Sequence, residues 1–255
     1  MLSISKQKKR ILHLVPEKAI FLIKKIVGPL RKVDEAYKGR KIEDIFSQIY
    51  KENIWGEVDA KKNVEFYSGS GSHNNTSIEY VEYIADFINS NGITSVTDIG
   101  CGDFNIGSQI CQNLTSAKYT GVDIVPSLIE RNIENYATDR INFICANALK
   151  DKVPVSDLLL IRQVFQHLSN EDILLTIKNV FPGFKHIIIT EQQLKDEYII
   201  KKNRNKPSGP HTRLDCLNSS VFLENKPFNL RTELVLSVDD ETQPKTRINS
   251  FLIHQ

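Results

Sequence analysis

The chain has 255 residues, enough for one domain of ordinary to large size with a complete hydrophobic core. Hydrophobic residues make up 40% and charged residues 25%, which is typical of a globular protein and excludes an intrinsically disordered chain. The formal net charge of +2 is too balanced to indicate a nucleic-acid-binding protein. The four cysteines form no CxxC pair, which argues against a zinc knuckle or a disulfide scaffold and favours a reducing, cytoplasmic location.

Positive charge is concentrated at the N-terminus. Residues 1–41 hold 12 Lys and Arg against 3 Asp and Glu, a net charge of +9. Apolar residues recur at helical spacing in the same segment, and Pro16 and Pro29 interrupt it. We therefore predict a basic amphipathic helical extension. It packs on its own domain or a second subunit, or it contacts an anionic membrane surface or a membrane-bound enzyme. The apolar run 19–23 is too short for a membrane span.

Two helices are predicted between this extension and the first strand, at 42–52 and 76–88. The Gly- and Ser-rich stretch 67–73 separates them. This stretch is either a flexible linker or a lid over a ligand, because its glycines allow close approach of the backbone.

From residue 95 onward, short β-rich runs alternate with helical ones. Strands are predicted at 95–99, 119–123, 141–145, 157–161 and 186–190, with helices at 104–114, after Pro126 and after Ser169. This alternation predicts a doubly wound parallel α/β sheet. Residues 230–238 and 247–254 are predicted to form an antiparallel hairpin at the sheet edge, after an irregular polar stretch of about 192–229.

A glycine loop follows the first strand, at the sheet edge where open α/β folds bind ligands. Asp98, Gly100 and Gly102 lie at the end of this strand, and Asp123 ends the second strand. The loop lacks the third glycine of a dinucleotide fingerprint and the lysine of a P-loop. Asp98 suits the cationic amino end of a methionine-type ligand, and Asp123 can accept hydrogen bonds from both hydroxyls of a ribose. The alternative is that the glycines serve only a tight turn.

The segments Asp98-Ile-Gly-Cys-Gly102, Gly121-Val-Asp123 and Asp157-Leu-Leu-Leu-Ile-Arg-Gln-Val-Phe-Gln-His-Leu168 resemble the class I S-adenosylmethionine-dependent methyltransferases. Residues 66–73, 162–170, 189–191, 209–213 and 227–230 resemble a bacterial subgroup that accompanies genes for capsule or O-antigen surface polysaccharides. The resemblance covers about residues 42–235. It implies a Rossmann-like methyltransferase domain over 42–255, with an acceptor-binding insertion at about 192–229 and S-adenosylhomocysteine as the product.

The resemblance also implies the cofactor-binding residues. They are Tyr67, Ser68, Gly69, Ser72, Asp98, Gly100, Gly102, Asp103, Phe104, Asp123, Ile124, Asn147, Ala148, Arg162 and Gln163. The sequence departs from the family pattern at two of these positions. Phe104 stands where the family often has a third glycine, and Asn147 replaces an acidic residue, although its amide can still hydrogen-bond to adenine.

Methyl transfer from a sulfonium requires alignment of acceptor, methyl group and sulfur, and often removal of a proton from the acceptor. The candidates for these tasks follow the fourth and fifth strands. His167 is either the base or a residue that packs near the cofactor. Glu191 is a base, a metal ligand or the partner of a histidine, and Arg162 needs an anionic partner, either Glu191 or an acidic acceptor.

Acceptor-binding residues are expected at Gln166 and in the loop that contains His211 and Arg213, unless that loop is merely solvated. We assign no metal site. The favoured function is O-methylation of a polar acceptor in surface-polysaccharide biosynthesis, at a sugar hydroxyl or a phosphate- or phosphoramidate-type oxygen. Alternatives are a small-molecule or RNA methyltransferase and a non-catalytic methyltransferase-like subunit. Nucleic acid is disfavoured because no [ND]-P-P-[YF] element follows the fourth strand.

Overall fold

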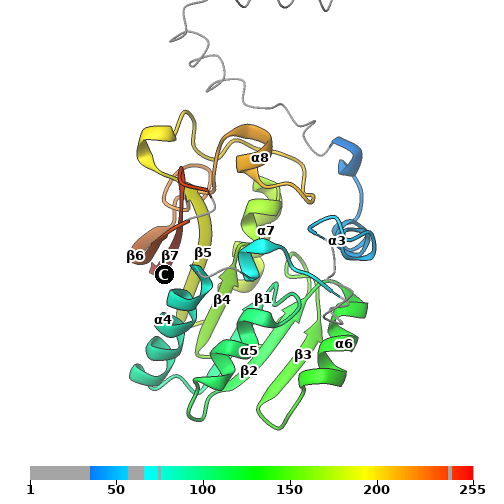
Figure 1. Cartoon of the computed structure of the whole chain (residues 1–255), viewed down its shortest axis with the longest axis vertical. Helices are drawn as coiled ribbons and strands as arrows, with labels where there is room; N and C mark the ends of the chain where they lie inside the picture. Colours follow the sequence, from blue (N-terminus) through cyan, green and yellow to red (C-terminus); the bar gives the residue numbers. More distant parts are fainter. Residues whose placement is uncertain (1–34, 57–65, 74–75, 241–242, 255) are drawn as a thin grey trace, which may run out of the picture.

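A computed structural model describes residues 35–56, 66–73, 76–240 and 243–254 of the chain. They form one seven-stranded sheet with the order β3-β2-β1-β4-β5-β7-β6 (Figure 1). Its strands are β1 (Ser95–Ile99), β2 (Lys118–Asp123), β3 (Ile141–Cys145), β4 (Leu158–Arg162), β5 (His186–Leu194), β6 (Arg231–Asp239) and β7 (Thr246–His254). Strands β1 to β5 are parallel, whereas β7 pairs antiparallel with both β5 and β6. The predicted doubly wound sheet with a C-terminal hairpin is confirmed.

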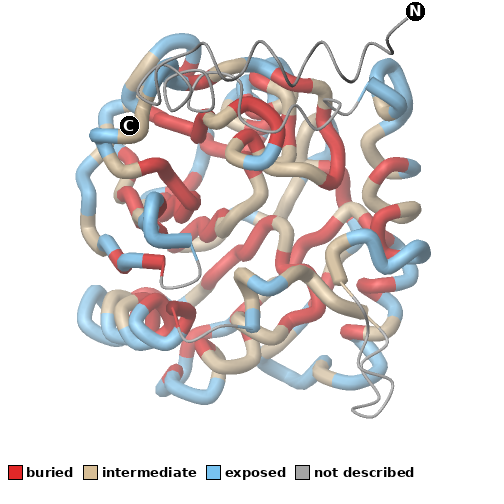
Figure 2. The backbone as a smooth tube through the Cα atoms, turned by 45° about the horizontal axis from the view of Figure 1, so that its top comes forward, coloured by how far each residue is buried: buried red, intermediate tan, exposed pale blue. Residues whose placement is uncertain are grey.

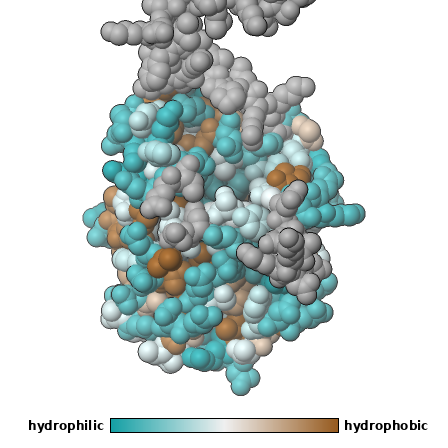
Figure 3. Space-filling view, in the orientation of Figure 1, coloured by the Kyte–Doolittle hydropathy of each residue, from teal (hydrophilic) through white to brown (hydrophobic). Residues whose placement is uncertain are grey.

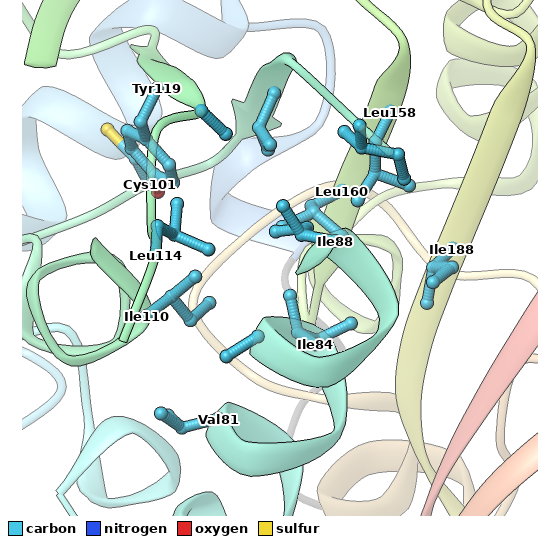
Figure 4. Close-up of a cluster of buried hydrophobic side chains, with 14 of the residues drawn as sticks. Val81, Ile84, Ile88, Cys101, Ile110, Leu114, Tyr119, Leu158, Leu160 and Ile188 are labelled. Atoms are coloured by element: carbon cyan, nitrogen blue, oxygen red, sulfur yellow. The ribbon is translucent and has the colours of Figure 1, made fainter. Parts of the chain in front are cut away.

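Helices α4 (Thr76–Ser90), α5 (Asn105–Gln112) and α6 (Pro126–Tyr136) pack on one face of the sheet. Their apolar side chains meet those of the central strands, as Figure 4 shows for Ile84, Ile110 and Leu160. Helix α7 (Asn170–Val180) covers the other face together with the segment 221–228. The Ser169 hydroxyl caps α7 by accepting a hydrogen bond from the Asp172 N–H at 3.0 Å. The central strands β1, β4 and β5 are thereby buried between two helical layers (Figure 2).

Strand β5 is longer than predicted. It continues through Glu191, Gln192 and Gln193, all of which are buried. The polarity of these residues indicated the start of an irregular stretch at 192. In the structure their side chains are satisfied internally, because the Gln192 amide donates to Asp240 at 2.6 Å and the Gln193 amide donates to the Val221 carbonyl.

Residues 1–34, which make up most of the predicted basic extension, lie outside the described residues. The membrane or partner contact of this segment stays a prediction, which co-sedimentation with anionic vesicles would test. No described helix is long and apolar enough to cross a bilayer. The face of the molecule in Figure 3 is largely hydrophilic, with hydrophobic residues in separate small patches.

Candidate active site

The glycine loop turns sharply at the carboxyl end of β1. Gly100 and Gly102 have φ angles of 74° and 57°, a region that favours glycine. Phe104 also has a positive φ, 65°, so it adopts the conformation of the glycine that the family often carries there. Its ring is 1% exposed and meets the Phe143 ring edge-on at 4.8 Å. Phe104 is therefore a core residue, and its prediction as a cofactor contact is corrected.

Asp98 is the last but one residue of β1, is 8% exposed and lines a cavity. The Tyr119 hydroxyl donates a hydrogen bond to it. Burial raises the pKa of Asp98 to about 7, against the opposing effects of the Tyr119 hydrogen bond and the Arg162 charge. A ligand ammonium group beside this carboxylate would restore its ionised form.

Asp123 ends β2 on the same cavity wall. Its carboxylate accepts hydrogen bonds from the N–H groups of Gly102 at 3.2 Å and Val125 at 3.1 Å. Burial raises the pKa of Asp123 to about 6, and these two N–H donors oppose the rise. The hydrogen bonds fix the carboxylate between the glycine loop and the start of α6.

Residues 66–73, drawn in cyan in Figure 1, are joined to the glycine loop, which favours a lid over a linker. The Asp103 carboxylate accepts hydrogen bonds from the Ser68 N–H at 3.0 Å and contacts His73 Nε2 at 2.9 Å. The Ser68 hydroxyl in turn accepts the Asp103 N–H at 2.8 Å. Burial alone would raise the pKa of Asp103, but the hydrogen bonds from His73, Ser68 and Asn105 outweigh it and lower that pKa.

Only some of the lid residues that were predicted to bind the cofactor lie at the cavity. Ser68, Gly69 and Ser72 line it, whereas Tyr67 does not. The Tyr67 ring stacks on the His73 ring at 4.7 Å. Tyr67 therefore supports the lid and does not contact the cavity, which corrects its assignment.

The cavity continues on the other side of Asp123 between apolar side chains. Ile42 and Phe46 of α3 (Ile42–Lys51) face Ile124 and Ala148 across it. Asn147 also lies on this wall, but its amide is engaged within the protein. It donates to Glu43 at 2.8 Å and accepts the Leu149 N–H at 2.9 Å. This placement disagrees with the predicted hydrogen bond from Asn147 to adenine, and it leaves an apolar slot suited to a flat ring.

Arg162 ends β4 and lies at the opposite end of the cavity. One guanidinium nitrogen donates to the Gly71 carbonyl at 2.9 Å, and the guanidinium group lies 5.1 Å from the centre of the Tyr80 ring. Its Nε is buried and has no partner among the described residues. Gln163 follows with a φ of 55°, and its side chain lies against Gly71 of the lid. Arg162 and Asp98 together present opposite charges to the same part of the cavity.

Gln166 and His167 belong to the short turn η4 (Phe165–His167), which follows β4 and lines the cavity. Gln166 Oε1 and His167 Nδ1 are buried without a partner in the described chain, whereas Gln166 Nε2 and His167 Nε2 lie 3.4 Å apart. Burial lowers the pKa of His167 to about 3, and the charge of Lys206 lowers it further. The imidazole is therefore neutral across the physiological pH range. The Trp55 ring lies 5.0 Å from it, and the Trp55 indole N–H donates to the Pro210 carbonyl at 2.9 Å.

Glu191 and Arg213 form hydrogen bonds with the backbone of η4, and they do not line the cavity. The Glu191 carboxylate, 0% exposed, accepts the N–H groups of Phe165 at 2.9 Å and Gln166 at 3.1 Å. The Arg213 guanidinium, 1% exposed, donates to the Phe165 carbonyl at 2.7 Å and to Asn170 at 2.8 Å. Burial raises the pKa of Glu191, and the two N–H donors and the Arg213 charge oppose that rise.

These contacts correct two assignments. Glu191 cannot act as a base on an acceptor, and Arg213 cannot bind an acceptor. Both side chains are hydrogen-bonded to the backbone of η4 instead. Both are positioning residues for Gln166 and His167. His211 is half-buried and also does not line the cavity, so its predicted contact with the acceptor is not supported.

The cavity joining these groups has a volume of about 320 Å³. Sequence reasoning identified most of the wall at the glycine loop and η4, but it missed residues that arrive from distant elements. These are Ile42, Phe46, Tyr80, Thr212, Gln192, Asp240 and Gln243. The apolar face of α3 was visible in the sequence, but nothing local distinguished a face on a cavity from one on the core.

The sequence model of a family described as "Methyltransferase domain" matches residues 96–185, the segment that carries Asp98, the glycine loop, Asp123 and η4. The chain is an S-adenosylmethionine-dependent methyltransferase. A sequence search of curated proteins finds no match.

Solved structures show the fold of this methyltransferase. N-methyltransferase NodS from Bradyrhizobium japonicum WM9, in complex with S-adenosyl-L-homocysteine, superposes with a TM-score of 0.53 at 13% identity, covering 83% of this chain and 100% of the other. Magnesium protoporphyrin IX methyltransferase from Synechocystis PCC 6803 has a TM-score of 0.49 at 13% identity, covering 83% and 97%. Human N-acetylserotonin methyltransferase has a TM-score of 0.49 at 12% identity, covering 85% and 60%.

The residues on the cavity wall fit this cofactor. The opposite charges of Asp98 and Arg162 match the ammonium and carboxylate groups of a methionine moiety, and the buried Nε of Arg162 would gain a partner. Asp123 would hold the ribose, and the apolar slot between Ile42, Phe46 and Ala148 would hold the adenine. When bound, the cofactor supplies an electrophilic methyl group on a sulfonium.

Cofactor binding should weaken as the pH falls. Asp98 and Asp123 have pKa values raised to about 7 and about 6, so lowering the pH protonates the carboxylates that the ligand ammonium and ribose hydroxyls require. We expect the affinity for S-adenosylhomocysteine to drop about tenfold or more between pH 8 and pH 5.5, as measured by calorimetry. The variant Asp98→Asn should flatten the profile. A constant affinity in the wild type would contradict these roles.

Proposed function

We propose that this methyltransferase transfers a methyl group to an oxygen of a polar acceptor in the biosynthesis of a capsule or O-antigen surface polysaccharide. The observation that carries this proposal is that Gln166 and His167 of η4 line the same cavity as Arg162 and Asp98, and that each has a buried polar atom without a hydrogen-bond partner in the described chain. The resemblance of residues 66–73, 162–170 and 209–213 to the polysaccharide-associated subgroup adds support for the pathway.

His167 is the group best placed to receive the acceptor proton. Its imidazole is neutral, because burial and the Lys206 charge hold the pKa near 3. Such an imidazole is a weak base, but a hydroxyl oxygen that is gaining a methyl group becomes far more acidic than an imidazolium ion. A proton leaving the oxygen as the C–O bond forms can therefore pass to a nitrogen of His167. Glu191 and Arg213 keep the turn in place for this transfer.

Incubation with methyl-labelled S-adenosylmethionine tests the proposal. Sugar nucleotides and lipid-linked or phosphorylated glycan precursors are the acceptors, and we expect label in the glycan as an O-methyl group. Label that enters RNA, or a small molecule unrelated to glycans, would overturn the proposed function.

The variant His167→Asn should transfer methyl groups about a hundredfold more slowly, because the proton acceptor is removed. Its affinity for S-adenosylhomocysteine should stay within about twofold of the wild type, since the ring lies beyond the cofactor-binding groups. Turnover and calorimetry on the same preparation measure both quantities. Near-normal turnover would make His167 a packing residue.

A further inference from the structure

The polar groups at the acceptor end of the cavity indicate which class of acceptor the enzyme methylates. This inference rests on the proposed function. Four buried side-chain nitrogen or oxygen atoms of the described chain have no hydrogen-bond partner within it, and three of them, Arg162 Nε, Gln166 Oε1 and His167 Nδ1, belong to residues that line this cavity. A buried polar atom without a partner costs free energy, so three such atoms in one cavity indicate a place for a ligand. Arg162 belongs to the cofactor end. Gln166 and His167 remain for the acceptor.

Cationic groups that could bind a phosphate or a carboxylate are engaged elsewhere. The Arg213 guanidinium donates to the carbonyls of Phe165 and Arg204 and to the Asn170 side chain. The Lys206 ammonium donates to the carbonyls of His167 at 3.2 Å and Pro207 at 2.7 Å. Neither Arg213 nor Lys206 lines the cavity, although the charges of both lower the pKa of His167.

The described part of the cavity wall is dominated by negative charge. Arg162 is its one residue with a permanent positive charge, against the aspartates Asp98, Asp103, Asp123, Asp215 and Asp240. The amide side chains of Gln166, Gln192 and Gln243 also line the cavity, and the Gln192 amide donates to Asp240 at 2.6 Å. An anionic acceptor would meet these carboxylates without a cation to pair with. A cationic acceptor group at η4 would instead be repelled by the nearby charges of Lys206 and Arg213, which add to the effect of burial in lowering the pKa of His167.

We infer that the acceptor group entering this cavity is an uncharged, hydroxylated ring, such as a neutral sugar, with hydroxyls hydrogen-bonded to Gln166 and His167. Gln166 Oε1 accepts one hydroxyl hydrogen. A second hydroxyl pairs with the ring of His167. The half-buried Trp55 ring, which lines the same part of the cavity beside His167, provides an aromatic surface for the sugar ring. A phosphate- or phosphoramidate-type oxygen is disfavoured as the methylated group.

Saturation-transfer NMR on the full chain, loaded with S-adenosylhomocysteine, tests this inference. The probes are the methyl glycosides of glucose, galactose, mannose and fucose, glucosamine, and the 1-phosphates of the same four sugars. We expect at least one neutral glycoside to bind about tenfold or more tightly than its phosphate or the amino sugar. Equal or tighter binding of a charged probe would overturn the inference. So would the absence of binding by all four neutral glycosides.

Variants locate the binding. Gln166→Leu should weaken glycoside binding about fivefold or more, because a hydroxyl loses its acceptor, whereas His186→Asn at the opposite end of β5 should leave it unchanged. Retained S-adenosylhomocysteine affinity shows that each variant is folded. Unchanged glycoside binding in Gln166→Leu would overturn the assignment.

The proposed function and the neutral acceptor can be disproved separately. Transfer of label to a phosphorylated group would preserve the proposed function and overturn the neutral acceptor. Binding of a neutral glycoside through Gln166, without label transfer to any glycan precursor, would preserve the site and overturn the function.

Discussion

The variant Arg213→Met should lower the free energy of unfolding by about 3–5 kcal/mol. Arg213 is 1% exposed, and its guanidinium donates three hydrogen bonds, to Phe165, Asn170 and Arg204. Its loss leaves Asn170 Oδ1 without its donor and removes one of the two hydrogen bonds to the Phe165 carbonyl, which also accepts the Leu168 N–H at 3.1 Å. It also leaves the Glu191 carboxylate, which is fully buried, without the charge of Arg213. Methionine fills much of the same volume, so a cavity contributes little to the effect.

Guanidinium chloride unfolding of wild type and variant measures this difference. Arg247→Met is the matched control, because Arg247 forms an exposed ion pair with Asp239 at 2.8 Å. Such a surface pair contributes about 1 kcal/mol or less. If Arg213→Met destabilised the protein no more than Arg247→Met does, the hydrogen bonds of Arg213 would not be the support of η4.

The variant Asp123→Ala should weaken S-adenosylhomocysteine binding about a hundredfold or more. Its carboxylate is expected to accept both ribose hydroxyls, and each hydrogen bond to a charged acceptor contributes about 1.5–3 kcal/mol. The variant also removes the acceptor of the Gly102 and Val125 N–H groups, which loosens the loop that faces the ligand.

Titration calorimetry measures this loss. Asp123→Asn is the conservative comparison, since an amide oxygen retains part of the hydrogen bonding, and we expect it to fall between wild type and Asp123→Ala. Asp139→Ala, at an exposed position between α6 and β3, should bind normally. Equal affinities of Asp123→Ala and wild type would place the ribose elsewhere.

The parts of the fold that local sequence determines were predictable. The apolar run at β4 encodes a buried parallel strand, and the Ser169 side chain marks the start of α7. The positions of Asp98 and Asp123 at two strand ends predicted their meeting at one cavity, because neighbouring parallel strands bring their carboxyl ends together.

The roles of Glu191 and Arg213 could not be read from the sequence. Both are ionisable residues beside a predicted site, and such residues are as consistent with catalysis as with structure. Their partner, the Phe165 peptide, lies 26 and 48 residues away along the chain. Phe104 was ambiguous for a related reason, since only the path of the loop decides whether its ring turns to the ligand or to the core.

A crystal structure with S-adenosylhomocysteine would show where the cofactor lies. We predict the ribose hydroxyls on Asp123, the amino acid moiety between Asp98 and Arg162, and the adenine against Ile42 and Phe46. Electron density for the ligand at another place on the protein, with this cavity filled by side chains, would contradict the account.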